Sequence, residues 1–490
     1  MKARLIIIIA LLGAIIGLPL LLKRESETAS PATADDRLVI ISPHNESIRR
    51  EFGEAFAAYW KREKDRSIYV DWRTPGGTSE IRMVLDAGFK AAEETGRQGI
   101  GVDLFFGGGE PDFSGQAKLG RFVPLDIFGR KPELFGDGKP VPEVFSGERF
   151  YAEDKVWVGT CISQFGICYN PDFIKRLGIS APGRWQDLGD KGYAGTLALA
   201  DPSKSGSVAR TFELIVQGEM QAARSRGDSL EKGWDEGLQL IQRMAANARY
   251  FTDSASKIPQ DVGQGNAAAG MSIDFYGRSY ASELSTREGR PRVVWIAPKG
   301  GTTMSADPIA VLKGAPHPII AQEFVGFCMS EEAQKLWFLL PGSDGGPVRR
   351  ALHRSPIRRD VYDDQTMPLT TMPDVRPYEG DANFIYEKEL TGKVFNTLRQ
   401  LVKVMCIDSH EEMKSAWQAM IAAGMPDEAM AVFQDVSNVS YRIAGQGDPG
   451  LDSRDPMIQA ARMHELGEMF RANYQQAEKI AESVTKRPLK

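Results

Sequence analysis

Cysteine is scarce in this chain of 490 residues, and no cysteine spacing suits a zinc site. The four cysteines are Cys161, Cys168, Cys328 and Cys406, with no C-x-x-C pair among them. Cys161 and Cys168 fall in extended chain about 20 Å apart, too far for a local disulfide. We therefore expect buried free thiols rather than a zinc centre or a disulfide framework.

An excess of positive charge is also lacking. Charged residues make up 26% of the chain, the net charge is -5, and no basic stripe is present. This balance argues against a nucleic-acid partner. Enzyme signatures are equally absent: the chain has no G-x-S-x-G, no H-E-x-x-H, no G-x-x-x-x-G-K-[ST] and no dinucleotide fingerprint after its first predicted strand. We therefore expect a protein that is not an enzyme.

Only one long hydrophobic run occurs, at residues 5–22, and basic residues flank both of its ends. Eighteen residues without a charge can cross a bilayer core. A cleaved signal peptide usually has a shorter run and a nearby cleavage site, whereas Ala32-Thr33-Ala34 lies ten residues further on and no lipoprotein cysteine follows. Residues 1–24 are therefore interpreted as an uncleaved signal-anchor, with a cleaved signal peptide as the alternative. Residues 25–37 are expected to form a flexible tether outside the cytoplasm.

The chain then alternates strand and helix patterns. Residues 38–41 are an all-apolar run typical of a buried parallel strand, and the next segment has an apolar residue at every fourth position: Ile48, Phe52, Phe56 and Trp60. Further strands are predicted at 68–72 and 102–106. This order indicates an open parallel α/β sheet, whose ligands bind beyond the carboxyl ends of the strands. The loops expected there are 42–45, 76–79 and 107–109.

A second α/β region follows at residues 162–280, and the chain then returns. Strands are predicted at 165–169, 197–200, 293–296 and 309–312, and one long helix is predicted at 318–340. Six prolines mark residues 341–380 as a connector that lies over a surface. Helical patterns are then predicted at 384–405, 411–423, 427–443 and 456–483. Residues 349–490 are therefore expected to form a Pro-rich connector and a helical C-terminal extension.

Two glycine-containing loops are candidate anion sites. Ser205-Gly206-Ser207 precedes an amphipathic helix, where free backbone N–H groups and hydroxyls could hold an anion. A plain helix N-cap explains the same residues equally well. For Gly77-Thr78-Ser79 the cap interpretation is favoured. His44 and Tyr276 could each contact or coordinate a ligand, although a turn histidine and a packed tyrosine are more often structural.

Several longer segments resemble one known family. They are "FGICYNPDFIKRLGISAPGRWQDL", "GTLALADPSKSGSVARTF", "VDLFFGGGE", "GNAAAGMSIDFYGRSY" and "ADPIAVLKGAPHPIIAQEFVGFCMSEEAQKLW". Together they are similar to the type II extracellular (family 1) solute-binding proteins of ABC importers, in particular the ferric-iron-binding subgroup, over residues 38–348. The resemblance implies an α/β, periplasmic-binding-protein-like II fold of two open lobes joined by a hinge. It places lobe one at 38–160 with 296–310, and lobe two at 161–295 with 311–348.

The resemblance also implies a ligand set, of which this chain keeps only part. His44 stands where the ferric-binding relatives have a histidine ligand, and Tyr276 matches one of their two adjacent tyrosines, the other being Phe275 here. Gly108 occupies the position of their acidic ligand. The Ser205–Ser207 loop matches the loop that holds a synergistic anion in those relatives. Fe(III) prefers anionic oxygen ligands, so these substitutions favour an anion as the ligand over bare iron.

We therefore expect an extracytoplasmic substrate-binding protein of an ABC transporter that captures a small anionic solute between its lobes. A phosphonate, an organic or sugar phosphate, or ferric iron as a chelate would suit. The alternatives are a membrane-tethered ligand sensor or adaptor and, less favoured, a hydrolytic enzyme. The expected partners are the solute, a permease and the membrane, with no nucleic acid, and the chain is expected to be a monomer. The expected ligand-binding residues are His44, Asn45, Thr78, Ser79, Gly108, Ser205, Gly206, Ser207, Asp274 and Tyr276, with His44 and Tyr276 as metal ligands only if iron is bound.

Overall fold

The computed structural model describes residues 30–284, 289–379 and 384–485. The predicted signal-anchor at 1–24 lies outside these ranges. Among the helices that are described, none combines the length and the apolarity needed to cross a bilayer. All four cysteines are buried and free, which confirms the prediction of buried thiols.

Lobe one is built on a parallel sheet in the order β2-β1-β3, as the sequence predicted. Its helix α2 (Glu46–Lys64) begins where the Asn45 side chain accepts a hydrogen bond from the Ile48 N–H, and all four residues of the predicted apolar face are buried. The remaining bounds are β1 (Asp36–Ile41), β2 (Ile68–Arg73), α3 (Thr78–Glu94), β3 (Leu104–Phe106), α4 (Glu110–Lys118), α5 (Ile127–Arg130), β4 (Val144–Phe145) and β5 (Glu148–Arg149).

Lobe two repeats this design with the parallel strands β9-β7-β8. Its central strand β7 (Leu197–Ala200) is fully buried, in line with its all-apolar sequence. The other elements of the lobe are α6 (Pro171–Leu177), α7 (Gly206–Ser225), α8 (Leu230–Ala246), β8 (Ala248–Thr252), α9 (Lys257–Gln264), β9 (Ala269–Ile273), α10 (Asp274–Glu283) and β10 (Val294–Ile296).

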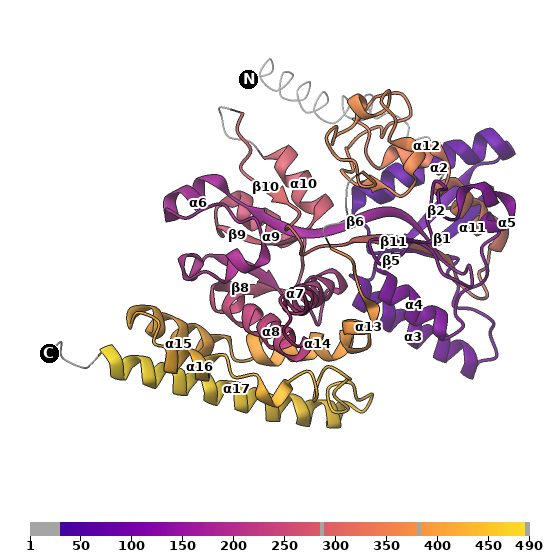
Figure 1. The fold of residues 1–490 in the computed structure, drawn as a ribbon. Helices are drawn as coiled ribbons and strands as arrows, with labels where there is room; N and C mark the ends of the chain where they lie inside the picture. Colours follow the sequence, from indigo (N-terminus) through magenta and orange to yellow (C-terminus); the bar gives the residue numbers. More distant parts are fainter. Residues whose placement is uncertain (1–29, 285–288, 380–383, 486–490) are drawn as a thin grey trace, which may run out of the picture.

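Two long strands join the lobes (Figure 1). Strand β6 (Val158–Tyr169) pairs with β11 (Met304–Val311) along its first part and with β9 and β10 along its second part. A short third strand, β12 (Ser355–Pro356), pairs with the middle of β6. One sheet therefore runs through both lobes, and any hinge motion must bend these crossing strands.

The structure corrects the expected assignment of residues 311–348 to lobe two. The predicted helix at 318–340 is two helices, α11 (Pro318–Cys328) and α12 (Glu331–Leu336), because the Ser330 side chain caps a new helix start. Both helices pack on lobe one. Phe324 lies edge-on to Phe56 of α2, with ring centroids 4.9 Å apart, so the apolar face of α11 is buried against lobe one.

The Pro-rich connector also differs from its prediction. It is not confined to a surface, since Leu352 and Ile357 join the core of lobe one and Arg354 is fully buried. Short 3-10 turns within the connector let its few apolar side chains form a small cluster with the end of α12. The connector thus belongs to lobe one rather than to a separate extension.

The C-terminal helices form a layer along α8 of lobe two (Figure 1). Trp417, Phe433 and Tyr474 share one buried cluster with Trp234 of α8. The predicted helices at 384–405 and 427–443 are shorter in the structure. The observed bounds are α13 (Lys388–Thr391), α14 (Phe395–Val402), a π-helical turn (Lys403–Ile407), α15 (His410–Ala422), α16 (Asp427–Phe433) and α17 (Pro456–Thr485).

Candidate functional site

A cleft of about 600 Å³ lies where the two lobes meet, beyond the carboxyl ends of their parallel strands. Loops from both lobes line it, as the position of ligand sites in open α/β sheets leads one to expect. Most of the residues singled out in the sequence lie on its wall. They are His44, Thr78, Gly108, Ser205, Gly206, Ser207 and Tyr276.

Three of the expected residues lie elsewhere. Asn45 is exposed and caps α2, so its side-chain oxygen serves the helix. Ser79 is not part of the cleft lining, and its hydroxyl accepts a hydrogen bond from Arg399 at 2.9 Å. Asp274 is buried behind the wall, where one carboxylate oxygen accepts the N–H of Phe275 at 2.9 Å.

Two helices from opposite lobes begin at the cleft. Helix α7 is capped by Ser205, whose hydroxyl accepts a hydrogen bond from the Val208 N–H at 3.4 Å. Ser205 also lies on the cleft wall, so it is both an N-cap and a lining residue. Helix α3 starts after Gly77, which offers no side-chain cap. The first N–H groups of each helix have no partner within the helix, and both dipoles present their positive ends here. The two helix starts together therefore create a positive electrostatic potential that favours a bound anion.

The two helix starts are almost in contact. A Cβ atom placed on Gly206 would lie only 2.7 Å from the Thr78 hydroxyl oxygen of the other lobe. Likewise, a Cβ on Gly77 would lie 3.8 Å from the backbone oxygen of Lys204. Only a residue without a side chain permits this approach at position 206. A solute held between these starts would therefore touch both lobes at once.

A buried ion pair forms part of the cleft wall, and sequence reasoning missed it. Arg354 of the connector pairs with Asp307 of β11 and donates to the Ser163 hydroxyl of β6. Burial opposes the charge on Asp307, but Arg354 and His44 outweigh it and lower the pKa of the carboxyl to about 2. Its other oxygen accepts the Gly108 N–H at 2.8 Å. The pair is buried and neutral overall. It therefore holds this part of the cleft wall in place and contributes little attraction for a charged solute.

His44 is bound into this pair. Its Nε2 lies 3.3 Å from the Asp307 carboxylate, and Arg354 approaches the same nitrogen at 3.2 Å. The ring also packs edge-on to Phe106 at 4.6 Å. Burial lowers the pKa of His44, so the ring is neutral at neutral pH. Its Nε2 is therefore occupied by protein groups and not free for a metal ion.

The surroundings of Tyr276 also suit iron poorly. Burial raises the pKa of this phenol, which therefore stays protonated and is a hydrogen-bond donor rather than a phenolate ligand. Within the described ranges, no three histidine, cysteine or acidic side chains gather as a metal site.

The charged side chains of the lining do not by themselves select an anion. Three carboxylates (Glu80, Asp253 and Asp307) stand with two cations (Lys204 and Arg354). Asp307 and Arg354 neutralise each other, and Asp253 and Lys204 are exposed at the mouth. The attraction for an anion must therefore come from the helix starts and hydroxyls, whereas the carboxylates suit hydroxyl groups of a solute.

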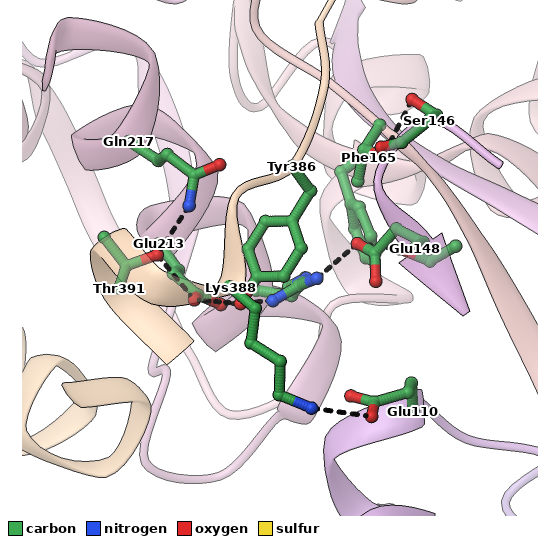
Figure 2. Close-up of polar contacts among 12 residues, drawn as sticks. Glu110, Ser146, Glu148, Phe165, Glu213, Gln217, Tyr386, Lys388 and Thr391 are labelled. Carbon is green, nitrogen blue, oxygen red and sulfur yellow. Dashed lines mark hydrogen bonds and ion pairs between the residues drawn. The ribbon is translucent and has the colours of Figure 1, made fainter. Parts of the chain in front are cut away.

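A smaller cavity of about 40 Å³ adjoins the cleft behind Ser207. Phe395 of α14 forms part of its wall, together with the buried pair of Arg210 and Glu148. Figure 2 shows this region, where Tyr386 and Lys388 of the C-terminal extension lie between Glu213 of lobe two and Glu110 of lobe one. The extension thus reaches the inner end of the site.

Comparisons with known proteins agree with this architecture. Residues 113–339 match the family of bacterial extracellular solute-binding proteins. The phosphoglycerate transport regulatory protein PgtC of Salmonella typhimurium is 24% identical over 179 residues, which are 36% of this chain and 40% of PgtC. An uncharacterised protein of Haemophilus influenzae is 26% identical over 266 residues, 53% of this chain and 67% of that protein. The chain therefore spans only two fifths of the length of PgtC.

Among solved structures, a Bordetella parapertussis protein provisionally described as an extracellular solute-binding protein superposes with a TM-score of 0.51 and 16% identity. The match covers 76% of this chain and 99% of that one. A structural match at this level of identity shows the fold alone, and it confirms the predicted fold class. Proteins of the matched family bind solutes outside the cytoplasm and are not enzymes. This description agrees with the expected extracytoplasmic location and with the expectation that the chain is not an enzyme. Residues 113–339 are thus similar to the bacterial extracellular solute-binding proteins, and the chain has a type II periplasmic-binding-protein fold.

Proposed function

We propose that this protein captures a small hydroxylated anion, best an organic or sugar phosphate, and delivers it to an ABC permease. The observation that carries the proposal is the meeting of the α3 and α7 helix starts across the cleft. An anion bound there accepts hydrogen bonds from both lobes only while they are together. The free energy of binding would then stabilise the closed arrangement of the lobes, as a transport receptor requires.

The hydroxyl groups of the wall support a phosphate or carboxylate in particular. Thr78, Ser205 and Ser207 surround the two helix starts. A tetrahedral phosphate can accept several such bonds at once, and Glu80 can accept a hydrogen bond from a solute hydroxyl. The likeness to PgtC, whose name refers to phosphoglycerate transport, points to the same class of solute.

A membrane-tethered sensor is the second candidate. The observation that favours it is the C-terminal helical layer, which is continuous with the core of lobe two. The word "regulatory" in the name of PgtC is consistent with it. In this case the closed lobes would be recognised by a signalling partner instead of a permease, and the ligand class would be unchanged. The N-terminal signal-anchor and a monomeric state belong to both candidates.

A thermal-shift screen of the full chain tests the ligand class. The panel contains phosphoglycerate, sugar phosphates, phosphonates, ferric chloride, ferric citrate and spermidine. A solute that binds only the folded state raises the melting temperature by mass action. We expect a phosphorylated, hydroxylated compound to give the largest shift.

Ser205→Ala and Ser229→Ala provide a matched pair for this screen. Both serines cap helices through their hydroxyls, Ser205 at α7 and Ser229 at α8, so each variant loses one cap. Only Ser205 lines the cleft. We expect Ser205→Ala alone to reduce the ligand-induced shift. Stabilisation by ferric iron alone, with no effect of Ser205→Ala, would refute the proposal.

A further inference from the structure

The C-terminal extension returns to the cleft through residues 384–399, here called the strap. The strap is fixed to α7 of lobe two. The Tyr386 hydroxyl donates to Glu213 at 2.8 Å, and the Gln217 amide donates to Thr391 at 2.8 Å, as Figure 2 shows. Arg210 of the same helix lies over the Tyr386 ring at 3.7 Å. Residues 384–386 are also bonded to lobe one, because the Tyr386 N–H donates to the Ser146 carbonyl at 3.0 Å and the Ser146 hydroxyl donates to the Phe384 carbonyl at 2.8 Å. The strap therefore begins in contact with both lobes, whereas α14 at its end packs into the core of lobe two.

Arg399 at the end of the strap contacts both lobes. Its guanidinium donates to the backbone oxygens of Pro202 at 2.9 Å and Ser203 at 3.0 Å, in the loop that leads into α7. The same group donates to the Ser79 hydroxyl of α3 at 2.9 Å. Arg399 is only 4% exposed. One buried side chain thus connects the two helix starts that flank the cleft.

A further contact between the strap and lobe one is weaker. The Lys388 ammonium lies 3.4 Å from Glu110 of α4, as Figure 2 shows. The Lys388 side chain is 57% exposed, and exposed ion pairs contribute little. Of these two charged strap residues, Arg399 therefore makes the stronger contact with lobe one.

We propose that Arg399 is a positioning residue that latches the two lobes together, so that the C-terminal extension takes part in closing the binding cleft. Its helix α14 packs into the core of lobe two through Leu398 and Leu401. When the lobes separate, the bonds to Pro202 and Ser203 stay intact and only the bond to Ser79 is lost. That bond therefore stabilises the closed state selectively.

The charge of Arg399 fits this role. Burial and the nearby Arg82 lower its pKa to about 10, which leaves the guanidinium protonated at neutral pH. A charged donor makes the stronger kind of hydrogen bond. It also adds positive potential directly behind both helix starts, where the proposed anion binds. The effect on anion affinity rests on the proposed function, whereas the effect on closure does not.

Thiol labelling of the cleft tests the latch without any ligand. An Ala255→Cys background places one reactive thiol on the cleft wall at a residue with no role in the proposed function, since all four native cysteines are buried. A polyethylene-glycol maleimide is too bulky to enter until the lobes separate, so its reaction rate reports the open fraction. We expect Arg399→Gln to speed labelling about tenfold, the loss of one charge-assisted hydrogen bond.

Two further variants separate the latch from a general loss of stability. Ser79→Ala removes the same bond from the side of lobe one and should speed labelling as much, and the double variant should add nothing more. Arg442→Gln is the matched control. This arginine of the extension is 85% exposed and faces Glu231 of lobe two at 3.8 Å, so labelling should stay at the wild-type rate.

The outcomes are distinct. Unchanged labelling in both Arg399→Gln and Ser79→Ala would overturn the latch, as would equal acceleration by Arg442→Gln. Phosphoglycerate is added as a probe in a second arm. If it fails to slow labelling of the background chain, phosphoglycerate is excluded as the solute of the proposed function, but faster labelling in the two latch variants still supports the inference.

Discussion

Replacing Gly206 by alanine should weaken solute binding while leaving the fold at least as stable. Gly206 is the first residue of α7, and its backbone is outside the left-handed region, so alanine can adopt the same conformation. Alanine is also the better helix former, by roughly 1 kcal/mol in a helix interior. The substitution therefore causes no backbone strain within lobe two itself.

The cost arises only when the lobes close. The new Cβ would lie 2.7 Å from the Thr78 hydroxyl oxygen and 3.2 Å from an Asp112 carboxylate oxygen, both in lobe one. These distances are shorter than ordinary van der Waals contact, so the Thr78 side chain must give up its position or the lobes must separate by several tenths of an ångström. Overpacking of this kind costs about 1–3 kcal/mol. Affinity for the solute should then fall about 5- to 150-fold.

Calorimetric titration measures this loss, with the anion that gives the largest thermal shift. Gly218→Ala is the matched control, because it lies in the same helix and the nearest atoms to its new Cβ are 3.9 Å away. Urea unfolding of both variants checks stability. Wild-type affinity in Gly206→Ala would refute the account of closure, and so would an equal loss of affinity in Gly218→Ala.

Three other predictions concern the wall of the cleft and its support. Asp307→Asn leaves Arg354 buried without its carboxylate and should cost about 3–5 kcal/mol in urea unfolding, whereas a loss below 1 kcal/mol would contradict the importance of the pair. Burial and Arg278 lower the pKa of His353 to about 4, below its unfolded value, so its contribution is present above about pH 6.5 and lost as the pH falls toward 4. The corresponding change in the free energy of unfolding is about 3 kcal/mol. His353→Gln should flatten this part of the stability–pH curve, and an unaltered curve would refute the assignment of this pH dependence to His353. Gly107→Ala should destabilise the fold by about 1–3 kcal/mol, because φ is 95° and the Cβ would lie 2.6 Å from the His44 ring; a neutral effect would show that the loop relaxes freely.

Local patterns predicted the elements of both lobes, because strand and helix periods depend on neighbouring residues. The fully apolar strand at 197–200 and the four-residue spacing from Ile48 to Trp60 are found as predicted. The glycine and hydroxyl residues of two loops also predicted that Ser205–Ser207 and Thr78 lie at the cleft, and the structure has them on its wall. Their role as solute ligands stays a prediction.

Side chains that reach the site from distant segments were not predictable in this way. Arg354 meets His44 across 310 positions, and Arg399 meets Ser79 across 320. No local period marks such a residue, and both lie in segments that read as connector or plain helix. Asn45 was misplaced for a related reason, since the same side chain suits either a ligand or an N-cap and only the geometry separates the two.

A crystal structure of the full chain with the solute selected by thermal shift would locate the ligand directly. We expect the anionic group between the starts of α3 and α7, within hydrogen-bond distance of Thr78 and Ser207. A ferric ion coordinated by His44 and Tyr276, with the two helix starts left without a ligand, would contradict this expectation.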